Sequence, residues 1–490
     1  MYNWFMLRIK EMWFFLLVGV VFIVISMLNV RNSHDWGGDF SMYISQSQNI
    51  LEGKPIGETG YIFNPQYPML SPKEYPPLFS IVITPIIAVW DIEIQPILIF
   101  VSLLFALSSI LMFVFFNKTE GVNKWWAIIL SIGFLLNPAI QLLKNEILSD
   151  ILLMVIILCF LIFYKKKNIW LLGVLTALAI LTKEIGYCLV IVFILDSIIS
   201  YIKKEDSAKT ISIEAVKFIG VTFLVVILVK LMVGSRFGSA YEAHFEQKDL
   251  WESIWINLGY YQRKIHFFLA IELGVWKLYK PLPILLGAIG LTMFIFGWIN
   301  SKKRINSLFL LVYFGVILVY PYRHGGFRFL FPIIPFILLW IFTSIKKFSW
   351  NNTKSGTRIA GFYFFLLIGS YIPHDVKTYH KRYMIKKGPN QIKNQAWMKY
   401  IKENTIKNSK VLFFKPRVLY LYTGCKSIAN KGDDSIEQIE RLMDEFDVNY
   451  IVYSKEFAVK NVMVIVKKHS YWQLVYNHDQ VKIFKKTDQI

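Results

Sequence analysis

The sequence has 490 residues, of which 55% are hydrophobic, 17% are aromatic and only 18% are charged. A water-soluble globular enzyme of this length needs a more polar surface, so the composition excludes that class and predicts a protein that uses lipid as its solvent. The net charge of +21 does not indicate a nucleic-acid partner, because most basic residues before the C-terminal tail form short clusters between apolar runs, where they orient a membrane protein.

The first apolar run, residues 12–30, is long enough to cross a hydrocarbon core of about 30 Å at about 1.5 Å per residue. Arg8 and Lys10 precede this run, so the N-terminus is predicted to be cytoplasmic. A signal peptide is the alternative, but the run is long and no small-residue cleavage site follows it. The run is therefore predicted to be a membrane anchor.

A long polar loop, residues 31–75, follows the anchor and is predicted to lie outside the cell. Asp39 comes after two glycines and before a helical stretch that contains Tyr43. Its two compatible interpretations are an N-cap of that helix and a carboxylate held at the membrane surface as a general base. The next piece, residues 76–90, begins with two prolines and is about fifteen residues long, which favours a helix lying in the outer leaflet over a full crossing.

About ten further apolar runs predict that the chain then crosses the membrane repeatedly, giving about eleven spans in all. Clusters of Lys and Arg follow every second run, which is typical of the cytoplasmic side. Runs 169–181 and 308–320 are short enough to be re-entrant, and the failure of one to cross would move the tail to the other side. The runs are 94–116, 125–143, 147–164, 169–181, 185–201, 211–233, 282–299, 308–320, 329–345 and 359–372.

Glu146 and Asp150 lie where one of these runs emerges on the outer side and the next begins. Their spacing of four residues predicts that they share one helix face, about a turn apart. Interfacial solvation and capping are the simpler explanation of this pair. The functional interpretation is that they bind a cation or orient an acceptor, although their few oxygens do not define a metal site.

Several cationic groups also fall on the predicted outer side, against the usual bias of positive residues towards the cytoplasm. Salt bridges to outer carboxylates are one explanation. We favour an anionic ligand, because Arg presents several donors to a phosphate group in a fork. The outer loop 234–281 adds polar groups among aromatic residues, which are more typical of an interfacial belt than of a sugar platform. The groups in question are Lys183, Arg323, His324 and Arg328, with Glu242 and His244 in loop 234–281.

The tail, residues 373–490, is polar and rich in lysine. Strand-like runs at 411–414 and 450–453 flank apolar residues at helical spacing within 434–446, which predicts a small α/β domain. We place this domain outside the cell, because long domains translocate largely regardless of their charge. The predicted fold class is thus mainly α, with a transmembrane helix bundle over residues 1–372, a catalytic outer loop at about 31–93, and an extracytoplasmic α/β domain over 373–490.

Acids and bases thus meet at the outer mouth of a predicted helix bundle. The cations could hold a lipid-borne phosphate, while a carboxylate takes a proton from an acceptor hydroxyl as that hydroxyl attacks the carbon bonded to the phosphate. A site with little water would strengthen both interactions. The reaction class predicted from these residues is glycosyl transfer.

The sequence resembles the C superfamily of glycosyltransferases (GT-C), which are integral membrane enzymes that use polyprenyl-phosphate sugars. The protein O-mannosyltransferase and aminoarabinose transferase branch is the nearest. The resemblance covers roughly residues 1–345, and the tail is similar to the extracytoplasmic α/β domain that many such enzymes carry. It depends on Asp39 followed by Tyr43 and Gly53, Tyr75-Pro-Pro-Leu78, Asn137-Pro138, the stretch from Glu146 to Asp150, and Arg328-Phe-Leu-Phe-Pro332.

The resemblance implies an inverting transfer to a hydroxyl of a lipid, glycan or protein at the outer face of the cell membrane. Asp39 stands at the position of the catalytic base. Phe40 stands where relatives often have a second acid, so no metal site is predicted; no cofactor is expected to be required, and a divalent cation is the weaker alternative. The implied roles are catalysis for Asp39, Glu146 and Asp150, donor-phosphate binding for Lys183, Arg323 and Arg328, and substrate contact for Tyr43, Glu74, His324, Glu242 and His244.

Three other classes of protein fit the sequence less well. A polytopic transporter commonly has two similar halves, whereas this sequence shows no duplication and carries its charges toward the ends of the runs. A polymerase or ligase of lipid-linked glycans would share the donor class but not the Asp39 loop. A scaffold would leave the opposed outer charges unexplained.

Overall fold

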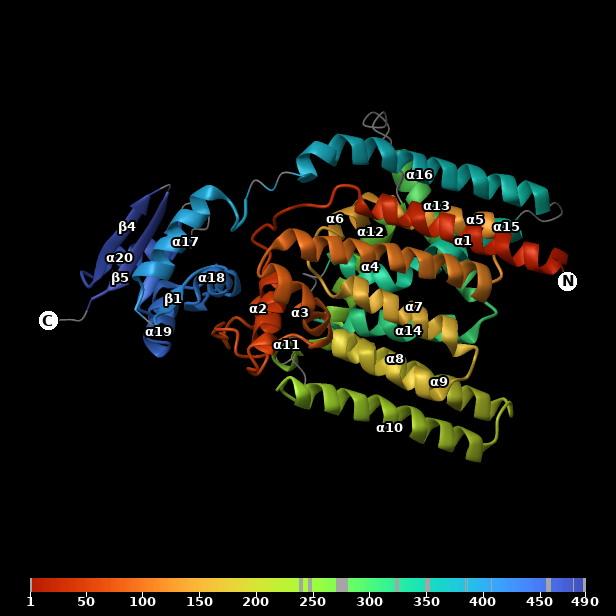
Figure 1. Ribbon diagram of the computed structural model, residues 1–490, viewed down its shortest axis with the longest axis horizontal. Coiled ribbons are helices and arrows are strands. Elements are labelled where there is room, and N and C mark those ends of the chain that lie inside the picture. Colours follow the sequence, from red (N-terminus) through yellow and green to blue (C-terminus); the bar gives the residue numbers. More distant parts are fainter. Residues whose placement is uncertain are drawn as a thin grey trace. The chain divides into compact units, whose positions relative to one another are not determined.

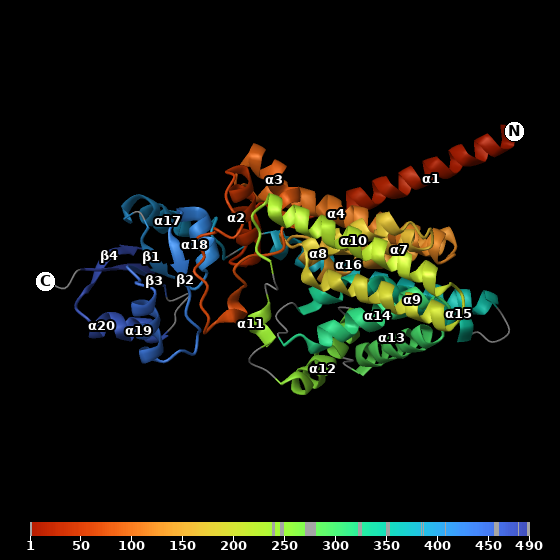
Figure 2. The same ribbon diagram turned by 90° about the horizontal axis from the view of Figure 1, so that it is seen from below.

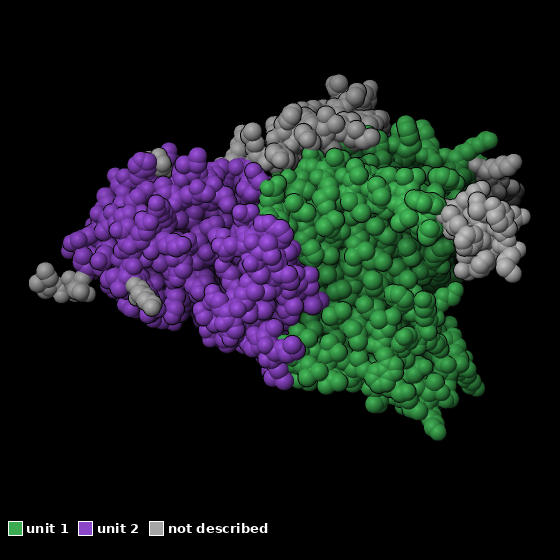
Figure 3. All heavy atoms as spheres, viewed as in Figure 1, with its two compact units in different colours: residues 1–31, 95–229, 248–384 green, residues 32–94, 230–247, 385–490 purple. Residues whose placement is uncertain are grey.

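The structure is a computed structural model that divides into two compact units, which are described separately (Figure 3). The first unit comprises residues 1–31, 95–229 and 248–384, and the second comprises residues 32–94, 230–247 and 385–490. The structure describes residues 2–237, 241–245, 249–269, 281–321, 326–348, 353–383, 385, 387–406, 408–454, 460–478 and 480–487.

The first unit is built from helices, and its long helices lie side by side along one direction (Figure 1). Every predicted apolar run contains a helix, which confirms the helical part of the prediction; the number of membrane crossings stays a prediction. By length and composition alone, four helices among the described residues could cross a membrane, and several shorter apolar helices accompany them. The helices are α1 (Tyr2–Met27), α4 (Ile94–Val114), α5 (Lys124–Leu135), α6 (Pro138–Leu143), α7 (Asp150–Tyr164), α8 (Ile169–Thr182), α9 (Cys188–Ile202), α10 (Ala208–Met232), α12 (Leu250–Leu269), α13 (Pro281–Ile299), α14 (Arg304–Val319), α15 (Ile334–Phe348) and α16 (Thr353–Tyr383).

The predicted run 125–143 is not one helix, because Asn137 and Pro138 interrupt it. Proline has no N–H to donate and is best tolerated in the first turn of a helix. Helix α5 accordingly ends at Leu135, and α6 begins at Pro138, with the Asn137 side chain accepting hydrogen bonds from the N–H groups of residues 139 and 140. The cap satisfies two donors that a helix start leaves open.

The ends of α7, α9 and α14 are joined by an ion-pair network, termed here the Arg304 network, of Arg304, Asp196, Glu205 and Tyr164. Arg304 Nε donates to Asp196 Oδ1 at 2.5 Å and the same guanidinium donates to Glu205. The Tyr164 hydroxyl donates to the other Asp196 oxygen at 2.6 Å. These groups lie at the predicted cytoplasmic ends of the helices, so one charged cluster fixes three helices relative to one another.

The second unit contains a five-stranded mixed sheet in the order β2-β1-β3-β5-β4. Strands β2, β1 and β3 are parallel, and β5 is antiparallel to both β3 and β4. Figure 2 shows helices α17 and α18 over one face of the sheet and α19 and α20 over the other. The elements are α17 (Ile392–Asn404), β1 (Lys410–Leu412), α18 (Pro416–Thr423), β2 (Lys426–Ile428), α19 (Ile436–Glu445), β3 (Tyr450–Ser454), α20 (Lys460–Lys468), β4 (Trp472–His478) and β5 (Val481–Lys486).

The predicted order of strand, helix and strand in the tail is confirmed by β1, α19 and β3. Apolar side chains of these elements form the core of the sheet, because each presents its hydrophobic face to the same interior. Ile439 and Leu442 of α19 are buried with Leu412 of β1 and Ile451 of β3.

The polar loop 32–94 folds together with the tail. It contributes α2 (Asp39–Leu51), the short helix η1 (Pro68–Leu70) and α3 (Leu78–Trp90) to the second unit. Its backbone also extends the sheet at β2, where Ile62 N donates to Ser427 O at 2.9 Å and Ser427 N donates to Gly60 O at 3.1 Å. Gly60 has a φ of +62°, and a Cβ there would lie 2.0 Å from the Tyr420 ring, so only glycine fits.

Candidate active site

Asp39 is the first residue of α2, and Gly38 occupies the N-cap position. The interpretation of Asp39 as the N-cap is therefore wrong, by one position. As a first-turn residue, its carboxylate lies at the positive end of the helix dipole, which favours negative charge. Its place in the first turn fixes the position of the carboxylate. The side chain is 25% exposed, so the carboxylate also remains accessible.

Tyr75 is the hydrogen-bond donor to Asp39. Its hydroxyl lies 2.7 Å from Asp39 Oδ1, and its ring is buried. Burial raises the pKa of Tyr75 to about 12, although the Arg417 guanidinium acts in the opposite direction. Tyr75 therefore keeps its proton at neutral pH and donates it in the bond to the carboxylate.

Arg417, in the first turn of α18, completes this group of side chains. Its Nη1 donates to the Tyr75 hydroxyl at 2.9 Å, and its Nη2 lies 3.6 Å from Asp39 Oδ1. Burial alone would lower the pKa of Arg417, but Tyr75 and Asp39 outweigh it and raise that pKa above the usual value. The guanidinium lies against Gly38, where a Cβ would be 2.4 Å from Nη2. We name Asp39, Tyr75 and Arg417 the Asp39 triad.

Arg417 is not among the site residues predicted from the sequence. The one local signal is that this arginine stands beside the apolar residues Val418, Leu419 and Leu421, all of which are buried. An arginine in such a stretch is seldom buried unless it has an acidic or hydroxyl partner. The partner here is 342 residues away in the sequence, so the local pattern could not identify it.

The other predicted residues of the second unit support its loops. The Tyr43 ring lies 5.0 Å from the Tyr75 ring, and so holds it from the side. Glu74 accepts hydrogen bonds from Ser235 Oγ at 2.7 Å and from the N–H of residue 236 at 2.8 Å. His244 Nε2 lies 2.9 Å from the Pro68 carbonyl, and Glu242 is exposed at the start of the same short helix, α11 (Glu242–Phe245). Their predicted substrate contacts stay predictions.

In the first unit, two predicted acids each face a cation. Glu146 Oε1 lies 3.5 Å from Arg31 Nη1, and Asp150 Oδ1 accepts from Lys183 Nζ at 2.5 Å. Glu146 lies in the turn before α7, whereas Asp150 is its first residue, so the prediction that they share a helix face is wrong. The reason is that the chain between them is not helical.

Lys183 and Arg328 meet at one aromatic ring of the first unit. The Lys183 ammonium lies 4.8 Å from the centre of the Phe329 ring, and the Arg328 guanidinium lies 5.6 Å from it. Asp150, Lys183 and Arg328 are therefore gathered around Phe329. Arg323 and His324 lie outside the described residues, and the joining of these cations with Asp39 in one site stays a prediction.

His34 and Asp35 are the groups of the second unit nearest in sequence to Asp39 that could bind a cation. His34 Nδ1 and Asp35 Oδ1 lie 3.3 Å apart. We assign no metal role to them, and the independence from cofactors stays a prediction.

Solved structures with a similar fold cover almost the whole chain. ArnT from Cupriavidus metallidurans bound to undecaprenyl phosphate matches with a TM-score of 0.56 at 12% identity, with 98% of each chain covered. Its apo state matches with 0.58 at 12% identity, over 97% of this chain and 98% of that chain. The archaeal oligosaccharyltransferase AglB from Archaeoglobus fulgidus, in complex with an inhibitory peptide and a dolichol-phosphate, matches with 0.58 at 12% identity, over 98% of this chain and 75% of AglB.

The fold therefore defines the class: a mainly helical protein with many apolar helices and a C-terminal mixed sheet of five strands, similar to ArnT. This confirms the predicted fold class, and at this identity the likeness is one of fold. The chain belongs to the family described as predicted membrane protein (DUF2079), which matches residues 37–406. No curated protein matches the sequence.

Proposed function

We propose that the protein is a membrane glycosyltransferase that moves a sugar from a polyprenyl-phosphate donor to a hydroxyl of a lipid, glycan or protein on the outer face of the membrane. The fold supports this proposal, since it matches ArnT bound to undecaprenyl phosphate and AglB in complex with a dolichol-phosphate. The single observation that carries it is the Asp39 carboxylate, held by Tyr75 and Arg417 and still accessible.

The mechanism uses Asp39 as a general base. Its carboxylate takes the proton of the acceptor hydroxyl as the acceptor oxygen forms a bond to the anomeric carbon of the sugar. The bond from that carbon to the phosphate oxygen breaks, and its electron pair leaves with the polyprenyl phosphate. Attack from the side opposite the phosphate inverts the anomeric configuration. Tyr75 and Arg417 hold the base in one orientation, so that little rearrangement accompanies the reaction.

Lys183 and Arg328 are proposed to bind the donor phosphate. Both cations lie against Phe329, and Asp150 fixes the Lys183 ammonium. Glu146 and Asp150 are proposed to assist the transfer by orienting the cations that they contact or by orienting the acceptor.

The test is Asp39→Asn, compared with wild type by mass spectrometry of total glycolipids and glycoproteins in cells that lack the native gene. Asparagine keeps a carbonyl oxygen to accept from Tyr75 but is not basic, so we expect the product to disappear while protein abundance is unchanged. The expected loss of turnover is at least about a hundredfold, since general-base catalysis contributes about 10²–10⁴.

Glu52→Gln is the matched control, because Glu52 is an exposed acid at the C-terminal end of the same helix and pairs only with Lys54 among the described residues. We expect this variant to make normal amounts of product. An Asp39→Asn enzyme with normal turnover would remove the base assignment, and identical glycan profiles with and without the wild-type protein would contradict the transferase itself.

A further inference from the structure

The segment that leads from β1 to α18 has the position of a ligand-binding loop in an α/β sheet. From β1 the chain passes through α18 to β2 on one side, and from β2 through α19 to β3 on the other side of β1. The order of connections thus reverses between β1 and β3, and the carboxyl ends of strands at such a point are where open α/β sheets bind ligands. Lys415 and Arg417 lie in and just after the segment that follows Leu412, the last residue of β1.

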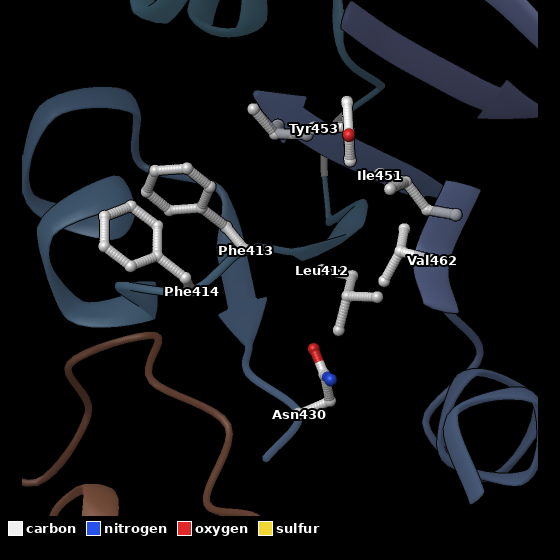
Figure 4. A pocket seen from close by; sticks show the side chains of 8 residues that line it. Leu412, Phe413, Phe414, Asn430, Ile451, Tyr453 and Val462 are labelled. Carbon is white, nitrogen blue, oxygen red and sulfur yellow. The ribbon is translucent and has the colours of Figure 1, made fainter. Parts of the chain in front are cut away.

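The hollow at this end of the sheet is too small to be the site itself. Its volume is about 20 Å³, and it is lined mainly by apolar residues, including Leu412, Ile451 and Val462 (Figure 4). Such a volume holds about one water molecule. Phe413 and Phe414 also line this hollow, and Figure 4 shows their rings beside each other and apart from Val462.

Aromatic contacts fasten this segment to the loop that carries Asp39. The Trp36 ring lies 5.9 Å from the Phe413 ring and 5.5 Å from the Phe414 ring, in both cases edge to face. Trp36 is followed by two glycines and Asp39, and Phe414 is followed by Lys415. These contacts and the Arg417 guanidinium hold the two segments together within the second unit, so Lys415 and Asp39 belong to one neighbourhood.

Lys415 is a half-buried cation that the fold does not neutralise. Within the described part of the chain its ammonium group forms no ion pair and no hydrogen bond, and it lies 5.9 Å from the centre of the Phe414 ring. Burial and the nearby Arg417 lower the pKa of Lys415, while Asp39 and Asp35 act in the opposite direction. A charged group withdrawn from water without a partner is costly, and an anion would relieve that cost.

We propose that the β1–α18 segment is a further anion-binding element of the active site, in which Lys415 binds the donor phosphate in addition to the cations proposed above, and Arg417 is a positioning residue for Asp39. This inference rests on the proposed transferase function. In the donor the phosphate is a diester, and on departure it becomes a monoester with up to one further negative charge. A lysine at the phosphate therefore stabilises the leaving group more than the ground state, which is what acceleration requires.

The test measures binding of radiolabelled undecaprenyl phosphate, and of uncharged undecaprenol, to the full chain in lipid nanodiscs. For Lys415→Gln we expect affinity for the phosphate to fall about tenfold, as for a lost hydrogen bond to a charged group, with undecaprenol unaffected. Lys415→Arg should retain affinity, because arginine also donates to phosphate. Lys426→Gln is the control, since Lys426 is an exposed lysine in the neighbouring strand β2. Thermal unfolding of each variant verifies its fold.

The outcomes of this experiment distinguish a failure of the proposed donor class from a failure of the role of Lys415. Wild type that binds the phosphate no better than undecaprenol would overturn both the donor class and the role of Lys415. Wild type that prefers the phosphate, together with a folded Lys415→Gln that binds it equally well, would overturn only the inference about Lys415. Equal losses in Lys415→Gln and Lys426→Gln would also overturn that inference, because the effect would then be one of general charge.

Discussion

The Asp39 triad stabilises a charge that the fold could not otherwise bury. The Arg417 side chain is only 6% exposed, and removal of one partner from a buried ion pair typically costs about 3–5 kcal/mol. Here the guanidinium has a hydroxyl and a carboxylate as partners, and the carboxylate has a fixed place as a result. The same contacts thus serve stability and the orientation of the base.

Gly38 gives a way to move Arg417 without changing any polar group. Its φ of −87° suits alanine, but the added Cβ would lie 2.4 Å from Arg417 Nη2 and would displace the guanidinium. For Gly38→Ala we expect kcat to fall about tenfold with KM for the donor nearly unchanged, because a misplaced base raises the barrier rather than weakening binding. Steady-state transfer assays measure both constants.

Two comparisons test this role of Arg417. Gly432→Ala is the control, since a Cβ at Gly432 meets nothing within 4 Å, and it should leave kcat unchanged. In an Arg417→Gln background, Gly38→Ala should have no further effect, because the group with which it clashes is gone. Fully additive losses of kcat in the double variant would mean that Gly38 and Arg417 act separately.

At the scale of elements, the Arg304 network, which joins the ends of α7, α9 and α14, is predicted to stabilise the first unit. Asp196 is 13% exposed and Arg304 is 28% exposed, so Arg304→Met leaves a largely desolvated carboxylate without its cation. We expect a loss of about 1–3 kcal/mol after allowance for solvent screening, and hence a Tm lowered by several degrees in detergent. Arg304→Met combined with Asp196→Asn should recover part of this loss, because the unpaired charge is removed.

The comparison for this prediction is Lys167→Met. Lys167 pairs with Asp206 nearby, but its side chain is 64% exposed, and exposed pairs contribute about 0–1 kcal/mol. A Tm shift as large as that of Arg304→Met would show that overall charge, and not the network, sets the stability.

A feature of the fold can be predicted from the sequence when neighbouring residues determine it, and not when it depends on contacts between distant residues. Long apolar runs predict helices reliably, because a chain in lipid must satisfy its backbone groups internally. The break at Pro138 also has a local cause, although the expectation of one continuous run overlooked it. The pairing of residues 60–62 with Ser427 has no local signal, and neither does the approach of Arg417 to Asp39. The sequence therefore identifies Asp39 as a candidate site residue from its neighbours, but it does not identify the distant side chains that contact it.

At the scale of the whole molecule, the second unit constrains how often the chain crosses the membrane. Its loop 32–94 and its tail share backbone hydrogen bonds at Ser427, so both must lie on the same side. The number of crossings between residues 94 and 385 is then even. The ten predicted runs in this interval meet that condition, whereas a single re-entrant run at 169–181 or 308–320 would violate it. The folded sheet thus argues against the alternative in which the tail changes side.

Cysteines introduced one at a time into a background in which Cys159, Cys188 and Cys425 are all replaced by serine test this topology with a membrane-impermeant thiol reagent. Glu52→Cys and Asp433→Cys are exposed positions of the loop and the tail, and both should react in intact cells. Lys209→Cys, exposed at the start of α10 on the predicted cytoplasmic side, should react only in opened cells. Reaction of Glu52→Cys and Asp433→Cys from opposite sides would contradict the shared unit. Reaction of both only in opened cells would invert the orientation and place Asp39 in the cytoplasm.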